Sequence, residues 1–130
     1  MESFYKELDD EQRAKAAIGE YDFDHPSAFD FEKMTHTISL LEQGEAVNIP
    51  KYDFMTGSRK GIMHLEPADV IIVEGILIFY DPLLRNKFAM KLFVDADADI
   101  RLARRVRCDT VERKRPLSVV LAQYTNKLDE

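Results

Sequence analysis

The sequence predicts an α/β fold with a mainly parallel sheet, and two apolar stretches carry this prediction. Residues 69–76, DVIIVEGI, and residues 90–95, MKLFVD, are runs of apolar residues that reach a carboxylate near their carboxyl end. Strands buried on both faces of a parallel sheet have this pattern. Stretches with helical spacing of apolar residues alternate with these runs, which is typical of α/β domains.

The N-terminal part is expected to hold two helices. Asp9 or Asp10 can cap a short helix that continues through Ala17, and Gly19 stops it. Asp30 is a favourable N-cap for a second helix. The apolar face of this second helix, which ends at Gly44, comprises Phe31, Met34, Ile38 and Leu41.

A β-hairpin is expected next. Residues 47–49 and 51–54 read as a strand that Pro50 interrupts. Residues 62–65 form the returning arm, and residues 56–61 form the tip.

Three further helices are expected in the C-terminal half. Asp81 and Pro82 begin a short one, in the favoured order of a cap followed by proline. Asp97 caps the next, whose apolar stripe is Ile100, Ala103 and Val106. Pro116 opens the last helix, which extends to about Lys127.

Composition predicts a single cytoplasmic globular domain, or a piece of one. The chain has 130 residues, of which 45% are hydrophobic and 32% are charged. No apolar run has the length of a membrane span, and the N-terminus lacks a signal-peptide pattern. The single Cys108 cannot form an internal disulfide, which favours a reducing compartment.

The net charge of −6 conceals a basic segment. Residues 101–115 contain seven Lys and Arg residues against Asp109 and Glu112, so the segment carries +5 and the remainder −11. A general nucleic-acid binder would spread its basic charge over a whole face of a basic domain. A compact basic segment in an acidic chain fits a small polyanion, although a solvated basic helix explains the charge equally well.

The stretch EYDFDHPSAFDF, residues 20–31, places aromatic rings around a carboxylate. One interpretation is structural, because Asp and His before a proline commonly form a turn that precedes a helix. The other is functional, because a flat ligand can stack on such rings while its hydroxyl groups meet Asp24.

Carboxylates also follow both predicted parallel strands. Glu74 follows the first, and Asp95 and Asp97 follow the second, next to the arginine helix. Ligands of parallel sheets bind at these strand ends, and phosphoryl transfer needs a carboxylate for magnesium together with cations for the phosphates. A phosphate-binding G-x-x-x-x-G-K-[ST] sequence is absent; residues 57–61, GSRKG, imitate it only poorly.

The whole chain resembles the uridine–cytidine kinases. The motifs that carry the resemblance, in family order, are SFYKEL, YDFDHPSAFD, IPKYDF, ADVIIVEGIL, MKLFVDADADIRLARRV and the closing QY. The resemblance implies a partial kinase domain over residues 1–130, with a hairpin insertion at about residues 46–66. It implies a three-layer P-loop kinase fold that is incomplete at both ends. The implied reaction is Mg²⁺-dependent transfer of the γ-phosphoryl group of ATP to the 5′-hydroxyl of uridine or cytidine. The expected pathway is pyrimidine salvage, and the expected assembly is a homo-oligomer. Neither nucleic acid nor membrane is expected as a partner.

The resemblance also implies roles for individual residues. Glu2 stands at the position of the catalytic base, where the family has Asp, and Asp24 matches the residue that grips the ribose hydroxyls. Glu74 matches the carboxylate on the magnesium side. The remaining matches are to the base pocket (Tyr52, Phe54), to further substrate contacts (Arg105, Arg115, Gln123) and to the phosphate-binding basic residues (Arg104, Arg107, Arg113). Core packing is expected for Phe29 and Phe31, and His25 is either a site residue or a hydrogen-bonded loop residue.

Several positions depart from the family pattern. Gly57 replaces a base-reading His, Cys108 replaces an Arg of the phosphate-binding helix, and residues 113–116 replace a glycine-containing loop. The family's phosphate-binding loop and its final strand have no counterpart among these residues.

Two functions from different classes therefore stay open. One is an ATP-dependent pyrimidine ribonucleoside kinase, and the other is a catalytically inactive nucleoside-binding or subunit-associating fragment of such a kinase. A related kinase acting on another small alcohol, such as phosphoribulose, is disfavoured by the F-D-H-P and P-x-Y-D-F motifs.

Overall fold

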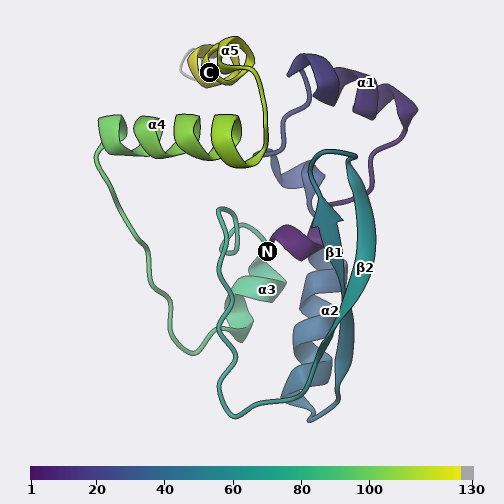
Figure 1. Ribbon diagram of the computed structural model, residues 1–130. Coiled ribbons are helices and arrows are strands. Elements are labelled where there is room, and N and C mark those ends of the chain that lie inside the picture. Colours follow the sequence, from purple (N-terminus) through teal and green to yellow (C-terminus); the bar gives the residue numbers. More distant parts are fainter. Residues whose placement is uncertain (127–130) are drawn as a thin grey trace. The chain divides into compact units, whose positions relative to one another are not determined.

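The chain folds into two compact units, which a computed structural model describes over residues 1–126 (Figure 1). The first unit comprises residues 1–8 and 22–91, and the second comprises residues 9–21 together with the chain from residue 92 onward. No helix of the described chain is both long enough and apolar enough to cross a membrane.

A β-hairpin dominates the first unit, as predicted. β1 (Val47–Asp53) and β2 (Ser58–Leu65) pair in antiparallel register, from Val47 opposite Leu65 to Asp53 opposite Ser58. Pro50 does not interrupt β1; instead the register shifts between Pro50 and Tyr52, where proline offers no N–H to the ladder. The tip spans residues 54–57 and is shorter than predicted, because β2 already begins at Ser58.

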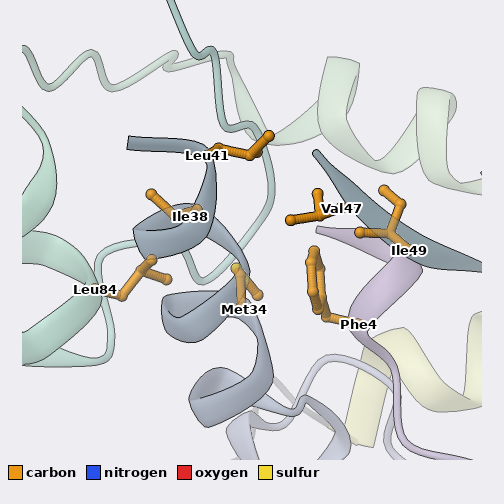
Figure 2. Packing of buried hydrophobic residues seen from close by; sticks show 7 residues of the cluster. All are labelled: Phe4, Met34, Ile38, Leu41, Val47, Ile49 and Leu84. Carbon is orange, nitrogen blue, oxygen red and sulfur yellow. The ribbon is translucent and has the colours of Figure 1, made fainter. Parts of the chain in front are cut away.

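The core of the first unit lies between this hairpin and helix α2 (Phe31–Glu42). Asp30 caps α2 as predicted, because its carboxylate accepts a hydrogen bond from the Lys33 N–H at 3.0 Å. The 3₁₀ turn η1 (Glu2–Phe4) and helix α3 (Pro82–Lys87) complete this core. Its buried members, shown in Figure 2, are Phe4, Met34, Ile38, Leu41, Val47, Ile49 and Leu84.

The second unit is helical. It contains α1 (Asp10–Ile18), α4 (Ala98–Arg107), a π-helical turn η3 (Cys108–Glu112) and α5 (Leu117–Asn126). Asp9 and Gln12 form a capping box at α1. Gly19 ends that helix with φ +83°, and a Cβ atom there would overlap the side chain of Val119. α4 begins directly after Asp97, but the Asp97 side chain makes no capping hydrogen bond, so this predicted cap is wrong. α5 begins directly after Pro116, and Lys127, its expected end, lies outside the described residues.

The parallel sheet predicted from residues 70–73 and 91–94 is not formed, and this prediction is wrong for the structure. Within residues 1–126 the hairpin is the only sheet. A strand needs a neighbouring strand to pair its backbone N–H and C=O groups, and neither segment has one. Both segments therefore present apolar side chains to solvent: Ile72 is 87% exposed and Phe93 is 84% exposed.

This exposure predicts that the purified chain self-associates, because unpaired apolar segments pair readily with other chains. Replacing two of the exposed side chains, Ile72→Ser with Phe93→Ser, should lower light scattering and the binding of a hydrophobic dye. Ile18→Ser is the matched control, since Ile18 is 63% exposed at the end of α1, and it should change neither signal. A sharp, reversible melting transition of a monomer would contradict the prediction.

Candidate functional site

An aromatic cluster forms around Tyr5 in the first unit. The centroid of the Tyr5 ring lies 4.2 Å from that of Phe29, 5.1 Å from Tyr52, 5.2 Å from Phe54 and 5.9 Å from Phe23. Tyr5 is only 5% exposed. The cluster therefore unites three segments: the N-terminal segment, the Asp-His-Pro loop and the end of the hairpin.

Backbone contacts hold Tyr5 in place. The Lys6 N–H donates to the Ala28 carbonyl at 2.9 Å, and the Asp30 N–H donates to the Phe4 carbonyl at 2.8 Å. Tyr5 thereby forms an antiparallel bridge with Phe29. On the hairpin side, the Arg59 Nε–H donates to the Tyr5 carbonyl at 3.2 Å. The ring at the centre of the cluster is thus positioned by three segments that lie far apart in sequence.

The hairpin tip is fastened to the same N-terminal segment at Gly57. The Leu8 N–H donates to the Gly57 carbonyl at 3.0 Å, and Gly57 has φ +59°. A Cβ atom at position 57 would lie 2.8 Å from Leu8 Cδ1. A histidine there would therefore need Leu8 to move and a strained backbone.

Asp53 organises the tip beside Tyr52 and Phe54. Its carboxylate accepts from Lys60 Nζ at 2.7 Å, from Thr56 Oγ1 at 2.9 Å and from the Met55 N–H at 2.9 Å. These hydrogen bonds, with that from Lys60 contributing most, lower the pKa of Asp53 from 3.8 to about 2. The tip that carries two of the predicted base-pocket rings is thus fixed by a charged carboxylate.

The loop between Phe23 and Phe29 carries Asp24 and His25. Asp24 is half-buried, and its N–H donates to the Asp22 carboxylate at 2.8 Å. The neighbouring Phe23 ring belongs to the aromatic cluster and lies 6.0 Å from Phe54. His25 caps the 3₁₀ turn η2 (Pro26–Ala28), because its Nδ1 accepts from the Ser27 N–H at 3.2 Å. This hydrogen bond supports the interpretation of His25 as a loop residue with a structural role.

Glu2 and Glu74, the predicted catalytic and magnesium-side carboxylates, come from neighbouring segments. The Met1 amino group donates to the Glu74 carbonyl at 2.9 Å and lies 3.8 Å from its carboxylate. The Glu74 side chain is 84% exposed. Residues 1–126 contain no group of three or more His, Cys, Asp or Glu side chains able to hold a metal ion.

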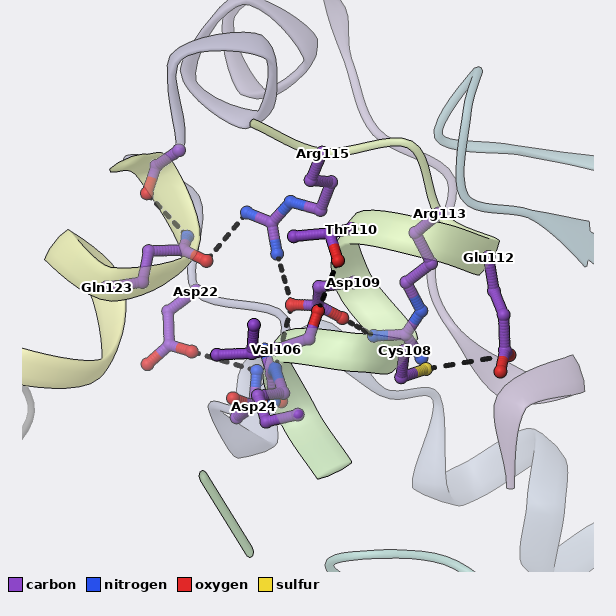
Figure 3. A network of polar contacts seen from close by, with 12 residues as sticks. Asp22, Asp24, Val106, Cys108, Asp109, Thr110, Glu112, Arg113, Arg115 and Gln123 are labelled. Carbon is purple, nitrogen blue, oxygen red and sulfur yellow. Dashed lines mark hydrogen bonds and ion pairs between the residues drawn. The ribbon is translucent and has the colours of Figure 1, made fainter. Parts of the chain in front are cut away.

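The predicted substrate contacts of the second unit converge on a residue that the sequence did not single out (Figure 3). Asp109 accepts from Arg105 Nε at 2.8 Å, from Arg113 Nη1 at 2.9 Å and from Arg115 Nη1 at 3.1 Å. Arg115 Nη2 also donates to Gln123 Oε1 at 2.6 Å. The structure thus brings Arg105, Arg115 and Gln123 into one hydrogen-bonded network.

The other predicted phosphate-binding residues lie on the exposed side of α4. Arg104 and Arg107 are exposed, whereas Cys108, which follows them, is half-buried. Burial raises the pKa of the Cys108 thiol, which lies 3.7 Å from Glu112 Oε2. Position 108 therefore holds an uncharged thiol at neutral pH.

The predicted site residues fall into two groups, one in each unit. Asp24, Tyr52, Phe54, Glu2 and Glu74 belong to the first unit. The arginines and Gln123 belong to the second. Sequence reasoning missed Tyr5, which no local pattern connects to the hairpin, and Asp109. Asp109 could have been found, because it lies four residues from both Arg105 and Arg113, the spacing of ion pairs on a helix.

Comparison with known proteins gives consistent matches over the chain. The model of the Phosphoribulokinase / Uridine kinase family matches residues 1–130. Uridine-cytidine kinase 2-B of Danio rerio is 54% identical over 125 residues, which cover 95% of this chain and 48% of that protein. Uridine kinase-like protein 4 of Arabidopsis thaliana is 50% identical over 125 residues, covering 96% of this chain and 26% of that protein. The chain thus spans about half the length of the Danio rerio protein and about a quarter of the length of the Arabidopsis thaliana protein.

The contacts of Asp53 predict its titration. Because its pKa in the folded chain is about 2, below the ordinary 3.8, its contribution to stability is present above pH 3.8 and is lost as the pH falls towards 2. An NMR titration of the Asp53 carboxyl carbon should have its midpoint near pH 2. Lys60→Gln should raise the midpoint, and Lys51→Gln, a change at an exposed lysine of the same hairpin, should leave it in place. A midpoint near 3.8 in the unchanged chain would refute this assignment.

Proposed function

Because the chain belongs to the Phosphoribulokinase / Uridine kinase family, we propose that it forms the nucleoside-binding part of an ATP-dependent uridine/cytidine kinase. The observation that carries this proposal is the aromatic cluster around Tyr5. One of its members, Phe23, directly precedes Asp24. Tyr5 is buried, whereas Phe23, Tyr52 and Phe54 are only half-buried. A pyrimidine base could therefore stack on these three rings.

The ribose is the second recognised part of the substrate. Asp24 follows Phe23 directly, and its backbone is held by the turn to Asp22. A carboxylate presents two charged acceptors, which suit the vicinal 2′- and 3′-hydroxyl groups of a ribonucleoside. Asp24 therefore gives this part of the site a preference for ribose over deoxyribose.

Phosphoryl transfer would need a base, cations and a metal ligand. Glu2 would accept the proton of the 5′-hydroxyl, and Arg104 and Arg107 would bind phosphate oxygens. Glu74 fits Mg²⁺ as an exposed oxygen ligand, because magnesium is commonly held by one or two carboxylates with water and phosphate oxygens. When bound, ATP would supply the transferable phosphoryl group, and Mg²⁺ would neutralise part of its charge.

Nucleoside binding without phosphoryl transfer, by these 130 residues taken alone, is the second candidate function. The observation in its favour is that the 130 residues contain no G-x-x-x-x-G-K-[ST] sequence. Electrostatic grip on the phosphates is the main catalytic contribution in phosphoryl transfer. Arginines on an exposed helix provide little of that grip, because each exposed contact is weak in water.

Nucleoside binding tests the part of the proposal that both candidates share. Asp24→Asn keeps the shape of the side chain but removes its charge, so we expect uridine to bind about 1–3 kcal/mol more weakly. 2′-Deoxyuridine, which lacks one hydroxyl group, should lose less. Asp81→Asn is the charge-matched control, because asparagine also caps a helix and the cap of α3 is retained. Equal calorimetric affinities of the unchanged chain and Asp24→Asn would sink the assignment of Asp24.

Transfer of labelled γ-phosphate separates the two candidates. We expect no phosphorylation of uridine or cytidine by the purified 130 residues, because they include no G-x-x-x-x-G-K-[ST] sequence whose backbone amides would hold the triphosphate. Fusing a relative's strand, phosphate-binding loop and second strand ahead of Ser3, with Asp in place of Glu2, should produce Mg²⁺-dependent transfer. Turnover by the unfused chain would refute the binding-only candidate. An inactive fusion that still binds uridine would instead place the defect at Gly57, at Cys108 or in C-terminal family elements that these residues do not include.

A further inference from the structure

Asp109 is the one buried charged residue of the described chain whose role the proposed function leaves unexplained. It is 0% exposed and lies in the π-helical turn η3. Three guanidinium groups donate to its carboxylate within 3.1 Å. A buried carboxylate is expensive unless it is paired, so this arrangement stabilises the anion and, equally, holds the three cations.

The local structure explains why these side chains meet. Arg105, Asp109 and Arg113 follow one another at intervals of four residues, so the continuation of α4 into η3 places them on one face. Arg115 is tied twice to the same residue, because its N–H also donates to the Asp109 carbonyl at 2.9 Å. Both oxygens of the carboxylate are used: Oδ1 by Arg113, and Oδ2 by Arg105 and Arg115.

The network extends from Asp109 to the end of α1. Arg115 donates to Gln123 of α5, and the Gln123 amide donates in turn to the carbonyl groups of Gly19 and Tyr21. All these residues belong to the second unit. One buried carboxylate therefore sets the direction of two predicted substrate contacts, Arg105 and Arg115, and influences a third through Arg115.

We propose that Asp109 is a positioning residue: it fixes the guanidinium groups of Arg105 and Arg115 in the directions that a nucleoside substrate requires, without contacting the substrate itself. This inference rests on the proposed function, which supplies the nucleoside. Its physical basis is that hydrogen bonds depend on direction, and that long arginine side chains lose much conformational freedom when they are ordered. A carboxylate that orders them beforehand removes that loss from the binding step.

Affinity for uridine is the first measurement. Asp109→Asn keeps the size of the side chain but replaces an acceptor oxygen with an NH₂ group that faces guanidinium donors, so we expect about tenfold weaker binding. Glu112→Gln removes a negative charge from the same turn, η3, and should change the affinity less than about twofold. Equal losses in both variants would attribute the effect to net charge and would overturn the inference.

A double-mutant cycle distinguishes positioning from general stabilisation. If Asp109 acts through Arg115, then Asp109→Asn should weaken uridine binding only about threefold in a chain that already carries Arg115→Lys. Independent effects that multiply would overturn the inference. Denaturant unfolding of each variant identifies any that fail to fold. If Asp109→Asn fails to fold, the NMR measurement below is made on the conservative Asp109→Glu instead.

The third measurement needs no nucleoside. In ¹⁵N NMR spectra, the Arg105 Nε–H, which donates to Asp109 at 2.8 Å, should exchange slowly with water in the unchanged chain and rapidly in Asp109→Asn. Unchanged exchange would overturn the positioning role. If the unchanged chain binds neither uridine nor cytidine, the proposed function fails by itself, and the exchange of Arg105 Nε–H still decides whether Asp109 orders the arginines.

Discussion

The pairing of backbone N–H and C=O groups decides which segments of this chain become regular. β1 and β2 satisfy one another across the hairpin. α2 and α3 begin where the carboxylates of Asp30 and Asp81 accept from N–H groups of the first turn. Residues 70–73 have the composition of a buried strand, yet in the described structure they lie beside no strand and Ile72 stays exposed. Apolar composition is therefore only one requirement of a buried strand, and a neighbouring strand is the other.

The aromatic cluster depends on the same requirement. Hydrogen bonds from Lys6 to Ala28, and from Leu8 to Gly57, bring the N-terminal segment alongside the Asp-His-Pro loop and the hairpin tip. Only this placement lets the Tyr5 ring meet residues that are more than twenty positions away. The proposed stacking surface is thus a consequence of backbone pairing between distant segments, and its rings add packing energy to an arrangement that the backbone has already fixed.

Local features of the fold were predictable from the sequence, and contacts between distant segments were not. Asp9 and Gly19 bound α1 because capping and left-handed conformations depend on a few adjacent residues. The hairpin was predictable from its alternating pattern, although the effect of Pro50 was a register shift and no break. Tyr5 and Asp109 escaped prediction for different reasons: Tyr5 gains its partners through tertiary contacts, whereas Asp109 looked like a minor acidic residue in a basic segment. The family motifs identified Asp24, Tyr52 and Arg105 as candidates, but they could not indicate which groups hold these side chains in place.

The place of Asp109 in a basic segment shows that charge and direction act differently at such a site. By charge alone, the acidic residue weakens the attraction of residues 101–115 for an anion, and its removal would strengthen that attraction at long range. At contact distance the balance reverses, because three guanidinium groups that repel one another would turn towards water if the carboxylate that collects them were absent. A hydrogen bond needs its donor to point at the acceptor, so ordered guanidinium groups contribute more to recognition than one additional unit of screened charge. In the proposed role, the buried carboxylate would therefore act on recognition by ordering these arginines, without contacting the ligand itself.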